Sequence, residues 1–328
     1  MINLEHIQVV AYTADKKQEW NAFVAASKNG TFLFDRNFMD YHSHRFTDAS
    51  VLIYHQQKLV ALFPANCCDQ KIYSHQGLSY GGMILSKKEK YSLGMQIFQA
   101  LLKHYWQAGF QHLELKEIPS IYHKYPSDEV LHWLFLCKAK LFRRDSLSVI
   151  NLQHPLFFSR DRKAGVKRGV KHKLEVKEVT AFDAFWNQIL IPNLQQKHQA
   201  KPVHTLEEIN LLKSRFPHTI RQFNVYYKGQ IVAGTTIFET HKVAHSQYIS
   251  GNADKNELGS LDFLHDYLVK KVFKNKDYFD FGISNEAHGT KVNTGLMYWK
   301  ESFGARTVTQ DFYSVETENY QLLNQVLL

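Results

Sequence analysis

The chain has 328 residues, of which 44% are hydrophobic and 14% aromatic, and its formal net charge is +9. This composition excludes a disordered chain, and no apolar run approaches the ~20 residues that span a bilayer. The three cysteines do not predict a disulfide framework, and nothing resembles the ligand spacing of a zinc site. We therefore expect a cytoplasmic protein of two domains, without a metal, and its positive charge modestly favours an anionic partner.

The first half of the chain shows hydrophobic patterns of helices, a hairpin, a further helix and a final strand. An aromatic-glycine segment, Tyr80-Gly81-Gly82, follows the hairpin. The predicted elements are helices over about 15–27 and 37–44, a hairpin over 51–61, a helix over 91–106 and a strand at 110–116.

The second half repeats this order. Thr205 is a good helix N-cap, because Glu207 and Glu208 follow it in the first turn, where acidic groups suit the helix dipole. A short aromatic-glycine segment, 248–251, again follows the hairpin. The predicted elements are helices over about 181–198 and 205–215, a hairpin over 223–233, a helix over 260–273 and a strand at 278–283.

The two hairpins align residue by residue. VLIYHQQKLVA at 51–61 matches FNVYYKGQIVA at 223–233, with Tyr54 opposite Tyr226. A repeat of this size predicts two similar modules, with a ligand site where they meet. We expect an α/β fold (a mixed α+β sheet with helices on both faces) built twice, over residues 1–153 and 154–328. Whether the tail after residue 310 packs back on the first module stays open.

The order of elements resembles the GNAT acyltransferase fold, and two copies in one chain resemble the FemABX family and the related FemAB-like acetyltransferases. Three segments carry the resemblance: SRDRKAGVKRGVKHKLEV at 159–176, YFDFGI at 278–283 and GLMYWKESFGAR at 295–306. The resemblance implies transfer of an acyl or aminoacyl group from acyl-CoA or aminoacyl-tRNA to an amine. It implies no tightly bound cofactor, a small-molecule or peptide acceptor, and tRNA as a possible partner.

Two charged residues in these motifs are candidate catalytic groups. Lys300 could stabilise the developing oxyanion or bind a phosphate, and the alternative is an ordinary surface lysine. Asp280 alternates with Phe279 and Phe281 on a strand, so it faces away from them and could accept the amine proton or orient Lys300. The alternative for Asp280 is an acidic residue of an edge strand or a loop cap.

Substrate-binding candidates follow the two hairpins, where the GNAT fold separates its strands and holds the acyl group. For both tyrosines, packing in the core remains the competing interpretation. The candidates are Tyr248, Ser250 and Asn252 in the second module, and Tyr80, His75 and Gln76 in the first.

Two further groups of polar residues are candidates for ligand contacts. Asn285, His288 and Asn293 lie in a polar loop after the strand 278–283, and such loops at the carboxyl ends of strands often bind ligands. Arg36 could meet an anionic acceptor, although for any single residue of this segment the sequence favours the basic outer face of an amphipathic helix.

A candidate donor site lies at the start of the helix predicted over residues 260–273. Gly259 and Ser260 open a helix, with Ser260 as a candidate N-cap, so a donor phosphate could bind there. However, SGNADKNELGSLDF at 250–263 lacks the complete glycine-rich signature of acetyl-CoA enzymes. The basic segment from Arg160 to Lys173 could instead meet an RNA backbone or form a solvated helix.

Three functions remain open from the sequence. The first is an N-acyltransferase, and the second is an aminoacyl-tRNA-dependent peptidyltransferase acting on a peptidoglycan precursor. The third is a non-catalytic binding protein that retains the fold and has lost its donor site.

Overall fold

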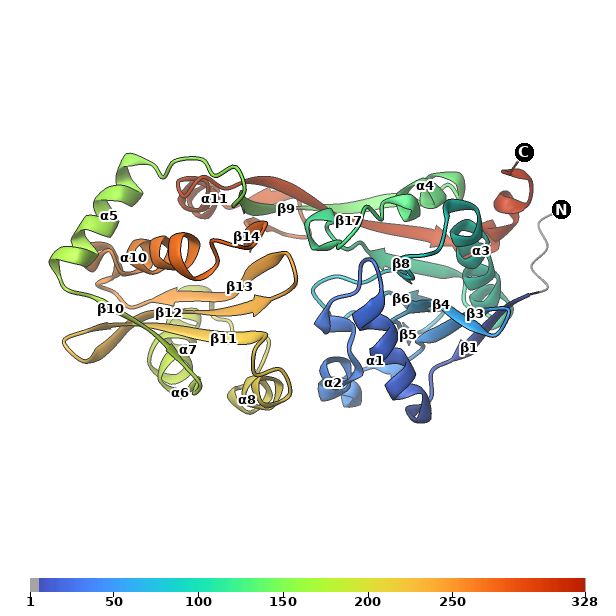
Figure 1. Cartoon of the computed structure of the whole chain (residues 1–328), viewed down its shortest axis with the longest axis horizontal. Helices are drawn as coiled ribbons and strands as arrows, with labels where there is room; N and C mark the ends of the chain where they lie inside the picture. The colour runs from blue at the N-terminus through green and yellow to red at the C-terminus, as the bar shows by residue number, and fades with distance from the viewer. Residues whose placement is uncertain (1–5, 328) are drawn as a thin grey trace. The chain divides into compact units, whose positions relative to one another are not determined.

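The computed structural model describes residues 6–327, and the chain divides into two compact units (Figure 1). Unit 1 comprises the chain up to Asp145 together with Thr309 onward, and unit 2 comprises Ser146–Val308. The sequence placed the division at 153/154, after the strand β9 (Lys140–Asn151), whereas the units divide within that strand. None of the helices in residues 6–327 is long and apolar enough to cross a membrane.

Unit 1 contains two groups of paired strands and a long amphipathic helix. One sheet has the strand order β1-β3-β4-β7, and the other strands of the unit follow the order β17-β8-β6-β5-β2. The strands are β1 (Ile7–Ala11), β2 (Thr47–Asp48), β3 (Val51–His55), β4 (Lys58–Phe63), β5 (Asn66–Cys68), β6 (Lys71–Tyr73), β7 (Ile84–Leu85), β8 (His112–Lys116) and β17 (Arg306–Glu316). The helices are α1 (Lys17–Ala26), α2 (Arg36–Met39), α3 (Tyr91–Gln107) and α4 (Glu129–Leu136), with short 3₁₀ turns at Ala14–Lys16, Phe32–Phe34, Asp40–Arg45, Ser120–Tyr122 and Thr317–Gln325.

The core of unit 1 forms between α3, α4 and the strands. Phe98 and Leu101 of α3 pack with Trp133 of α4 and with Phe63 of β4, and all four side chains are buried. Burying large side chains of this kind is the main driving force for folding the unit. The apolar periodicity of residues 91–106 therefore correctly predicted α3, the helix that packs against β4 in this core.

Unit 2 contains one mixed sheet in the strand order β10-β11-β12-β13-β14-β9. Its strands besides β9 are β10 (Glu175–Val179), β11 (Ile220–Tyr227), β12 (Gln230–Glu239), β13 (Val243–Gly251) and β14 (Tyr278–Ile283), with a small hairpin of β15 (Asn285–Glu286) and β16 (Lys291–Val292). Its helices are α5 (Arg160–Lys171), α6 (Asp183–Phe185), α7 (Ile191–His198), α8 (Leu206–Arg215), α9 (Lys255–Leu258), α10 (Ser260–Tyr267) and α11 (Thr294–Glu301), with π-helical turns at Trp186–Leu190 and Leu268–Val272.

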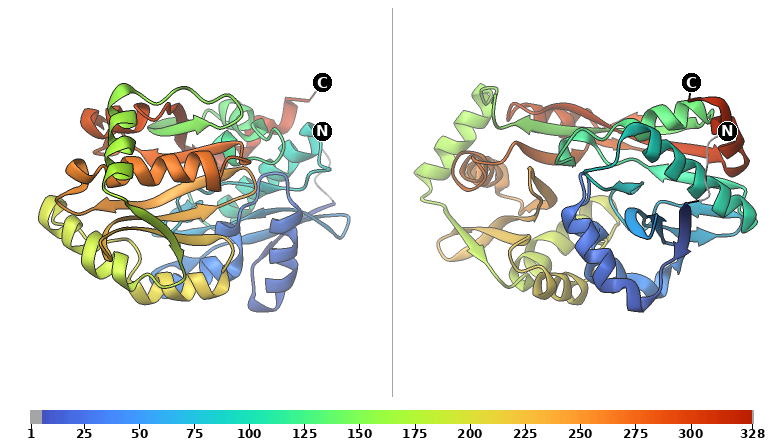
Figure 2. Two further views of the ribbon diagram at one scale, coloured as in Figure 1. Left: turned by 60° about the vertical axis from the view of Figure 1, so that its left-hand side comes forward. Right: turned by 45° about the vertical axis from the view of Figure 1, so that its right-hand side comes forward.

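Helices cover both faces of the sheet in unit 2. Leu264 of α10 packs with Phe279 and Phe281 of β14 in the hydrophobic core of unit 2, and α5 lies against α10. Figure 1 places α6, α7 and α8 on the opposite side of the strands β11–β13, and the left view of Figure 2 shows α10 lying across them. Residues of β14 that face away from α10 therefore point towards the side of α6–α8.

The sequence repeat corresponds to a structural repeat. Both predicted hairpins are confirmed, and each has a register shift immediately before the aligned tyrosine, between Ile53 and Tyr54 in one and between Val225 and Tyr226 in the other. Each two-residue turn, Gln56-Gln57 or Lys228-Gly229, has positive φ at both positions. Turns of this kind match the right-handed twist of paired strands. The shared bulge and turn support one supersecondary unit used twice.

Candidate functional site

The strands β13 and β14 of unit 2 form a fork. They pair in parallel only from Val243↔Tyr278 to His245↔Asp280, and beyond this point β13 pairs with β12 alone among the described strands. A register shift opposite Thr236 and Ile237 makes Gln247 an extra residue in β13, and such a bulge bends a strand. The edge of β13 beyond His245 thus presents backbone groups that are not used by β14.

An imidazole and a carboxylate meet at the apex of this fork. His245 Nδ1 lies 2.8 Å from Asp280 Oδ2, and the backbone N–H of Gly282 donates to Asp280 Oδ1 at 2.7 Å. Asp280 is 0% exposed, whereas the side chain of His245 is 19% exposed. Because Nδ1 faces the carboxylate, the other ring nitrogen, Nε2, is the atom that remains for a substrate. The pair has the geometry of an oriented general base.

Lys300 lies in α11 and is buried, with 3% of its surface exposed. Its ammonium donates to the carbonyl oxygens of Gly282 at 3.0 Å and Ile283 at 2.6 Å. Burial lowers the pKa of Lys300 to about 8, and the charge of Asp280 partly opposes this change. The interpretation of Lys300 as a surface residue is therefore wrong. Its contacts hold the end of β14 beside Asp280, and a role with an oxyanion or phosphate stays a prediction.

Tyr248 and Ser250 connect β13 to the helices on one face of the sheet. The Tyr248 hydroxyl accepts from the backbone N–H of His204 at 3.1 Å and lies 2.6 Å from His204 Nδ1. Asn193 of α7 donates to Ser250 Oγ at 2.9 Å. Burial raises the pKa of Tyr248 to about 12, so its hydroxyl is neutral at physiological pH. Asn252 lies at the end of the strand, where its Oδ1 accepts from the N–H of Asp254.

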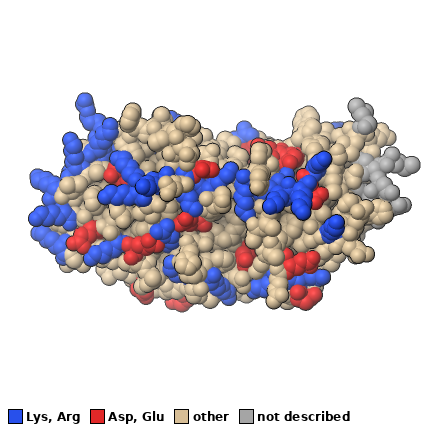
Figure 3. Space-filling view, in the orientation of Figure 1, with Lys and Arg blue, Asp and Glu red and all other residues tan. Residues whose placement is uncertain are grey.

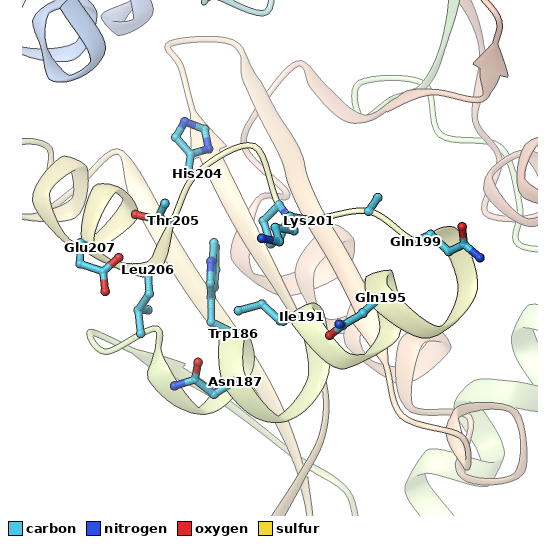
Figure 4. A pocket seen from close by; sticks show the side chains of 12 residues that line it. Trp186, Asn187, Ile191, Gln195, Gln199, Lys201, His204, Thr205, Leu206 and Glu207 are labelled. Atoms are coloured by element: carbon cyan, nitrogen blue, oxygen red, sulfur yellow. The ribbon is translucent and has the colours of Figure 1, made fainter. Parts of the chain in front are cut away.

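A cavity of about 630 Å³ opens beside these helices (Figure 4). Its lining includes Trp186 of the π-helical turn, Ile191 of α7, and Leu206 at the start of α8. His204, which contacts Tyr248, also lines it. Its volume is in the range of small-molecule sites, which are mostly apolar with a few polar groups. The sequence predicted α8 and its N-cap correctly, and Thr205 and Glu208 form a capping box.

The polar loop after β14 forms the β15–β16 hairpin. Asn285 is buried, and its Oδ1 accepts from the N–H of Ser146 at 2.9 Å. Asn293 is the N-cap of α11, and its Oδ1 accepts from the N–H of Leu296 at 3.0 Å. His288 is exposed with φ of +54°. The two asparagines therefore have clear structural roles, and ligand binding by these residues remains a prediction.

The predicted donor site at Gly259 and Ser260 requires a correction. Gly259, not Ser260, is the N-cap of α10, and both residues are buried under α5. A Cβ on Gly259 would lie 2.1 Å from the carbonyl oxygen of Gly165, so the two helices are in close backbone contact. Arg162 of α5 also pairs with Asp262 at 2.5 Å. The N-terminus of α10 therefore has no open space for a donor phosphate.

The corresponding region of unit 1 is filled by the chain itself. The hairpin of β5 and β6 is inserted after β4, and β6 pairs in parallel with β8. Ser74 accepts a hydrogen bond from the N–H of Lys116 at 2.8 Å, and the N–H of Gly81 donates to the carbonyl of Lys116 at 2.6 Å. A Cβ on Gly81 would lie 1.8 Å from the carbonyl oxygen of Ser74. This packing leaves no open fork next to β8.

The predicted substrate residues of unit 1 pack this filled region. Tyr80 is buried, donates to Thr31 Oγ1 at 3.0 Å, and contacts the ring of Phe34 edge-on. For Tyr80, core packing therefore replaces the substrate contact that we predicted. Burial lowers the pKa of His75 to about 3, so this histidine is neutral at physiological pH. Gln76 exchanges two hydrogen bonds with Asn66, each of 2.8 Å.

Arg36 also requires a correction. It is 4% exposed, forms an ion pair with Asp48, and has a second one of 3.1 Å with Asp40. Its guanidinium lies 3.6 Å above the ring of Tyr12. A buried cation needs such compensation, and these contacts occupy the groups that an anionic acceptor would need.

Three residues of this region were not candidates from the sequence: His245, Trp186 and His204. The strand pattern of residues 243–251 was visible, but the chain has 18 histidines, and the pattern gave no reason to select one. The predicted βαβ crossover was a signal that could have pointed to His245. A crossover of this kind makes β13 and β14 parallel neighbours, so that some residue of β13 must lie beside Asp280. The exact partner depends on the register, which the sequence does not give.

No protein-family model matches the sequence, and no curated protein matches it either. Among solved structures, FemX superposes with a TM-score of 0.68 at 11% identity over 97% of this chain and 100% of its own. L-PGS from Bacillus licheniformis gives 0.59 at 11% identity over 93% and 92%, respectively. A tandem GNAT protein from the clavulanic acid biosynthesis pathway gives 0.54 at 10% identity over 95% and 98%.

These likenesses identify the fold. The chain has the FemX-like, tandem GNAT arrangement, and the fold predicted from the order of the elements is confirmed. At about one identical residue in ten, the comparisons do not transfer a substrate or a residue role to this chain.

Proposed function

We propose that this protein is an N-acyltransferase whose reaction takes place at the fork between β13 and β14 of unit 2. The supporting observation is the His245–Asp280 pair at the apex of an open fork, with an N–O distance of 2.8 Å. We assign the reaction to unit 2 because, among the described residues, only this unit combines an open fork between two strands with a histidine–aspartate pair. In unit 1 the corresponding region is filled by the chain. The FemX-like fold is consistent with such a reaction.

The proposed chemistry needs one base and one set of hydrogen-bond donors. The acceptor attacks as the neutral amine, and Nε2 of His245 accepts a proton from its nitrogen as the new bond forms, while Asp280 keeps Nδ1 protonated and stabilises the charged ring. The amine nitrogen forms a bond to the acyl carbon, and backbone N–H groups on the edge of β13 stabilise the tetrahedral oxyanion. When the intermediate collapses, the bond from carbon to the donor sulfur or oxygen breaks, and the leaving group takes the proton from His245.

Lys300 would act here as a positioning residue. Its two hydrogen bonds to the carbonyls of Gly282 and Ile283 fix the end of β14, and Gly282 in turn donates to Asp280. Its positive charge is attracted by the negative charge of Asp280. We therefore assign the proton transfer to His245 rather than to Lys300.

The surface of unit 2 favours a donor attached to a polyanion. With the N-terminus of α10 covered, an acyl-CoA pyrophosphate cannot bind there as it does in acetyltransferases with an open glycine-rich loop. In contrast, α5 exposes Arg160, Lys163, Lys167 and Lys171, and Figure 3 shows Lys and Arg side chains gathered at this end of the molecule. This supports aminoacyl-tRNA over acyl-CoA, with a peptide amine such as a peptidoglycan precursor as acceptor.

A product assay tests the proposed function. The protein is incubated with acetyl-CoA or with a mixed pool of aminoacyl-tRNAs, and with amino acids, dipeptides and a UDP-linked muropeptide as acceptors. Mass spectrometry should detect an N-acylated or N-aminoacylated acceptor, with the tRNA donor more effective at low salt than at high salt. Binding of these ligands without any product would contradict the proposal and favour a non-catalytic binding protein.

A further inference from the structure

Two apolar side chains lie in solvent just before α5. Phe157 is 92% exposed and Leu156 is 48% exposed, although the next residue, Phe158, is buried in the core of unit 2. The backbone after this apolar pair is held in place, because the N–H of Ser159 donates to the carbonyl oxygen of Ser302 at 2.8 Å. The fold therefore imposes the exposure of the pair. Exposed apolar surface beside charged residues is typical of interaction sites.

The helix that follows presents a cationic face to solvent. Its opposite side packs on α10, and a Cβ on Gly169 would lie 2.6 Å from the Cβ of Phe263. Exposed cations recur every three or four positions of α5, which places them along one face over about 16 Å. These cations are Arg160, Lys163, Lys167 and Lys171. Figure 1 draws α5 along the outer edge of unit 2, and Figure 3 shows Lys and Arg side chains gathered there.

The cationic face is not neutralised by the protein itself. None of its four cations forms an ion pair within residues 6–327, whereas Arg162, on the side towards α10, pairs with Asp262 at 2.5 Å. The single acidic residue of α5, Asp161, accepts from the hydroxyl of Tyr298 at 3.1 Å. The face therefore carries a net positive charge, which attracts an anionic partner.

The apolar pair and the cationic face belong to one surface. The ammonium of Lys163 lies 5.5 Å from the centre of the Phe157 ring. An anionic membrane offers the complementary groups, because its charged headgroups lie directly above apolar acyl chains. Phenylalanine and leucine side chains enter the boundary of the acyl chains, while lysine and arginine stay among the headgroups.

An RNA would use only part of this surface. Its phosphates could pair with the cations of α5, which is how the proposed function uses them, and an unpaired base could stack on Phe157. Leu156 has neither a charge nor an aromatic ring, so an RNA leaves it unused. A bilayer uses the apolar pair and the cations together, and we therefore favour a membrane as the occupant. The proposed reaction at the fork does not depend on which of the two occupies α5.

We propose that the apolar pair and the cationic face of α5 dock this protein on the surface of an anionic membrane. Leu156 and Phe157 enter the boundary between headgroups and acyl chains, and the four cations contact the phosphates of anionic lipids. Binding is peripheral and reversible, because two side chains bury only a small apolar area. This inference goes beyond the proposed function and holds for any donor or acceptor.

Flotation of the full chain with lipid vesicles tests the inference. Phosphatidylcholine vesicles that contain about 30% phosphatidylglycerol should bind at least about tenfold more protein than phosphatidylcholine alone, and high salt should weaken this binding. Lys163→Gln together with Lys167→Gln should lower the partition coefficient at least about tenfold, because each cation near the surface contributes about fivefold. Leu156→Ser together with Phe157→Ser should lower it by a similar factor.

Unit 1 offers matched controls at exposed positions. Leu131→Ser together with Phe135→Ser changes another exposed apolar pair, and Lys138→Gln together with Lys140→Gln changes another two lysines. Both control variants should bind anionic vesicles within about twofold of the wild type. If they lose as much binding as the variants at α5, the docking surface is not the one proposed.

A conservative variant separates a membrane from an RNA. Phe157→Leu removes the aromatic ring but keeps an apolar side chain, so it should bind anionic vesicles within about threefold of the wild type. The inference is overturned if anionic vesicles bind no better than phosphatidylcholine alone, or if the two serine substitutions at α5 leave binding unchanged. Binding of tRNA without binding of vesicles would also overturn it and assign α5 to an RNA. The product assay with soluble acceptors is independent of these results, so the proposed reaction can fail or succeed separately.

Discussion

Replacing Asp280 by asparagine should lower kcat/KM by about a thousandfold while leaving the acceptor KM nearly unchanged. Asp280 is fully buried and is the hydrogen-bond partner of His245 Nδ1 at 2.8 Å. An amide has nearly the same shape, but it does not compensate a charged imidazole and does not require Nδ1 to carry the proton. Steady-state kinetics with the donor and acceptor found in the product assay would measure the effect.

The pH profile separates this positioning role from a structural one. Loss of the carboxylate should change the shape of the profile of kcat/KM against pH, whereas a purely structural effect would lower kcat/KM by the same factor at every pH. Asp254→Asn, at an exposed position outside the fork, is the matched control. If Asp280→Asn has wild-type kinetics with an unchanged profile, His245 does not act as the oriented base.

Glu117→Gln should stabilise unit 1 in alkaline solution and have little effect in acid. Glu117 follows β8, and its Oε1 is shielded from solvent and has no hydrogen-bond partner within residues 6–327. Burial, with the charges of Asp311 and Asp128, raises the pKa of Glu117 to about 8. The folded chain therefore holds this proton where the unfolded chain has lost it, and stability falls as the pH rises from about 4.5 to about 8.

Urea unfolding of the wild type and of the Glu117→Gln variant at pH 5 and pH 9 measures this difference. Relative to the wild type, the variant should gain on the order of 2–4 kcal/mol more in free energy of unfolding at pH 9 than at pH 5. Glu318→Gln, an exposed change in the same unit, should show no such dependence. An equal effect of Glu117→Gln at both pH values would mean that Glu117 is ionised in the folded chain throughout.

The local structure was predictable because its determinants are local. Tyr54 and Tyr226 marked equivalent positions of two hairpins, and both occur at a bulge. Thr205 followed by Glu208 predicted a capped helix, and both hydrogen bonds of the capping box are present. Alternation in YFDFGI correctly placed Asp280 on the side opposite Phe279 and Phe281, which lie in the core with α10.

The site itself depended on long-range contacts that the sequence does not encode locally. Whether a glycine at a helix start binds a phosphate depends on what covers it, and Gly165 of α5 covers Gly259. Whether Arg36 meets a ligand depends on Asp48 and Asp40, which neutralise it. The choice of His245 required the register of β13 on β14, which three residue pairs define.

The insertion of β5 and β6 explains how two similar modules can have different roles. In unit 1 this hairpin and the segment around Gly81 occupy the space next to β8, whereas in unit 2 the chain passes directly from β12 to β13. A repeat conserves the sheet and its helix, because both are needed for the core. It does not require both forks to stay open.

A comparison of two histidine variants tests the central claim most directly. His245→Asn changes the apex of the fork in unit 2, and His75→Asn changes a buried histidine in the filled region of unit 1. The account predicts that the first variant lowers kcat/KM by at least about a hundredfold, while the second stays within about threefold of the wild type once folding is confirmed. A full loss of activity in His75→Asn with normal turnover by His245→Asn would contradict it.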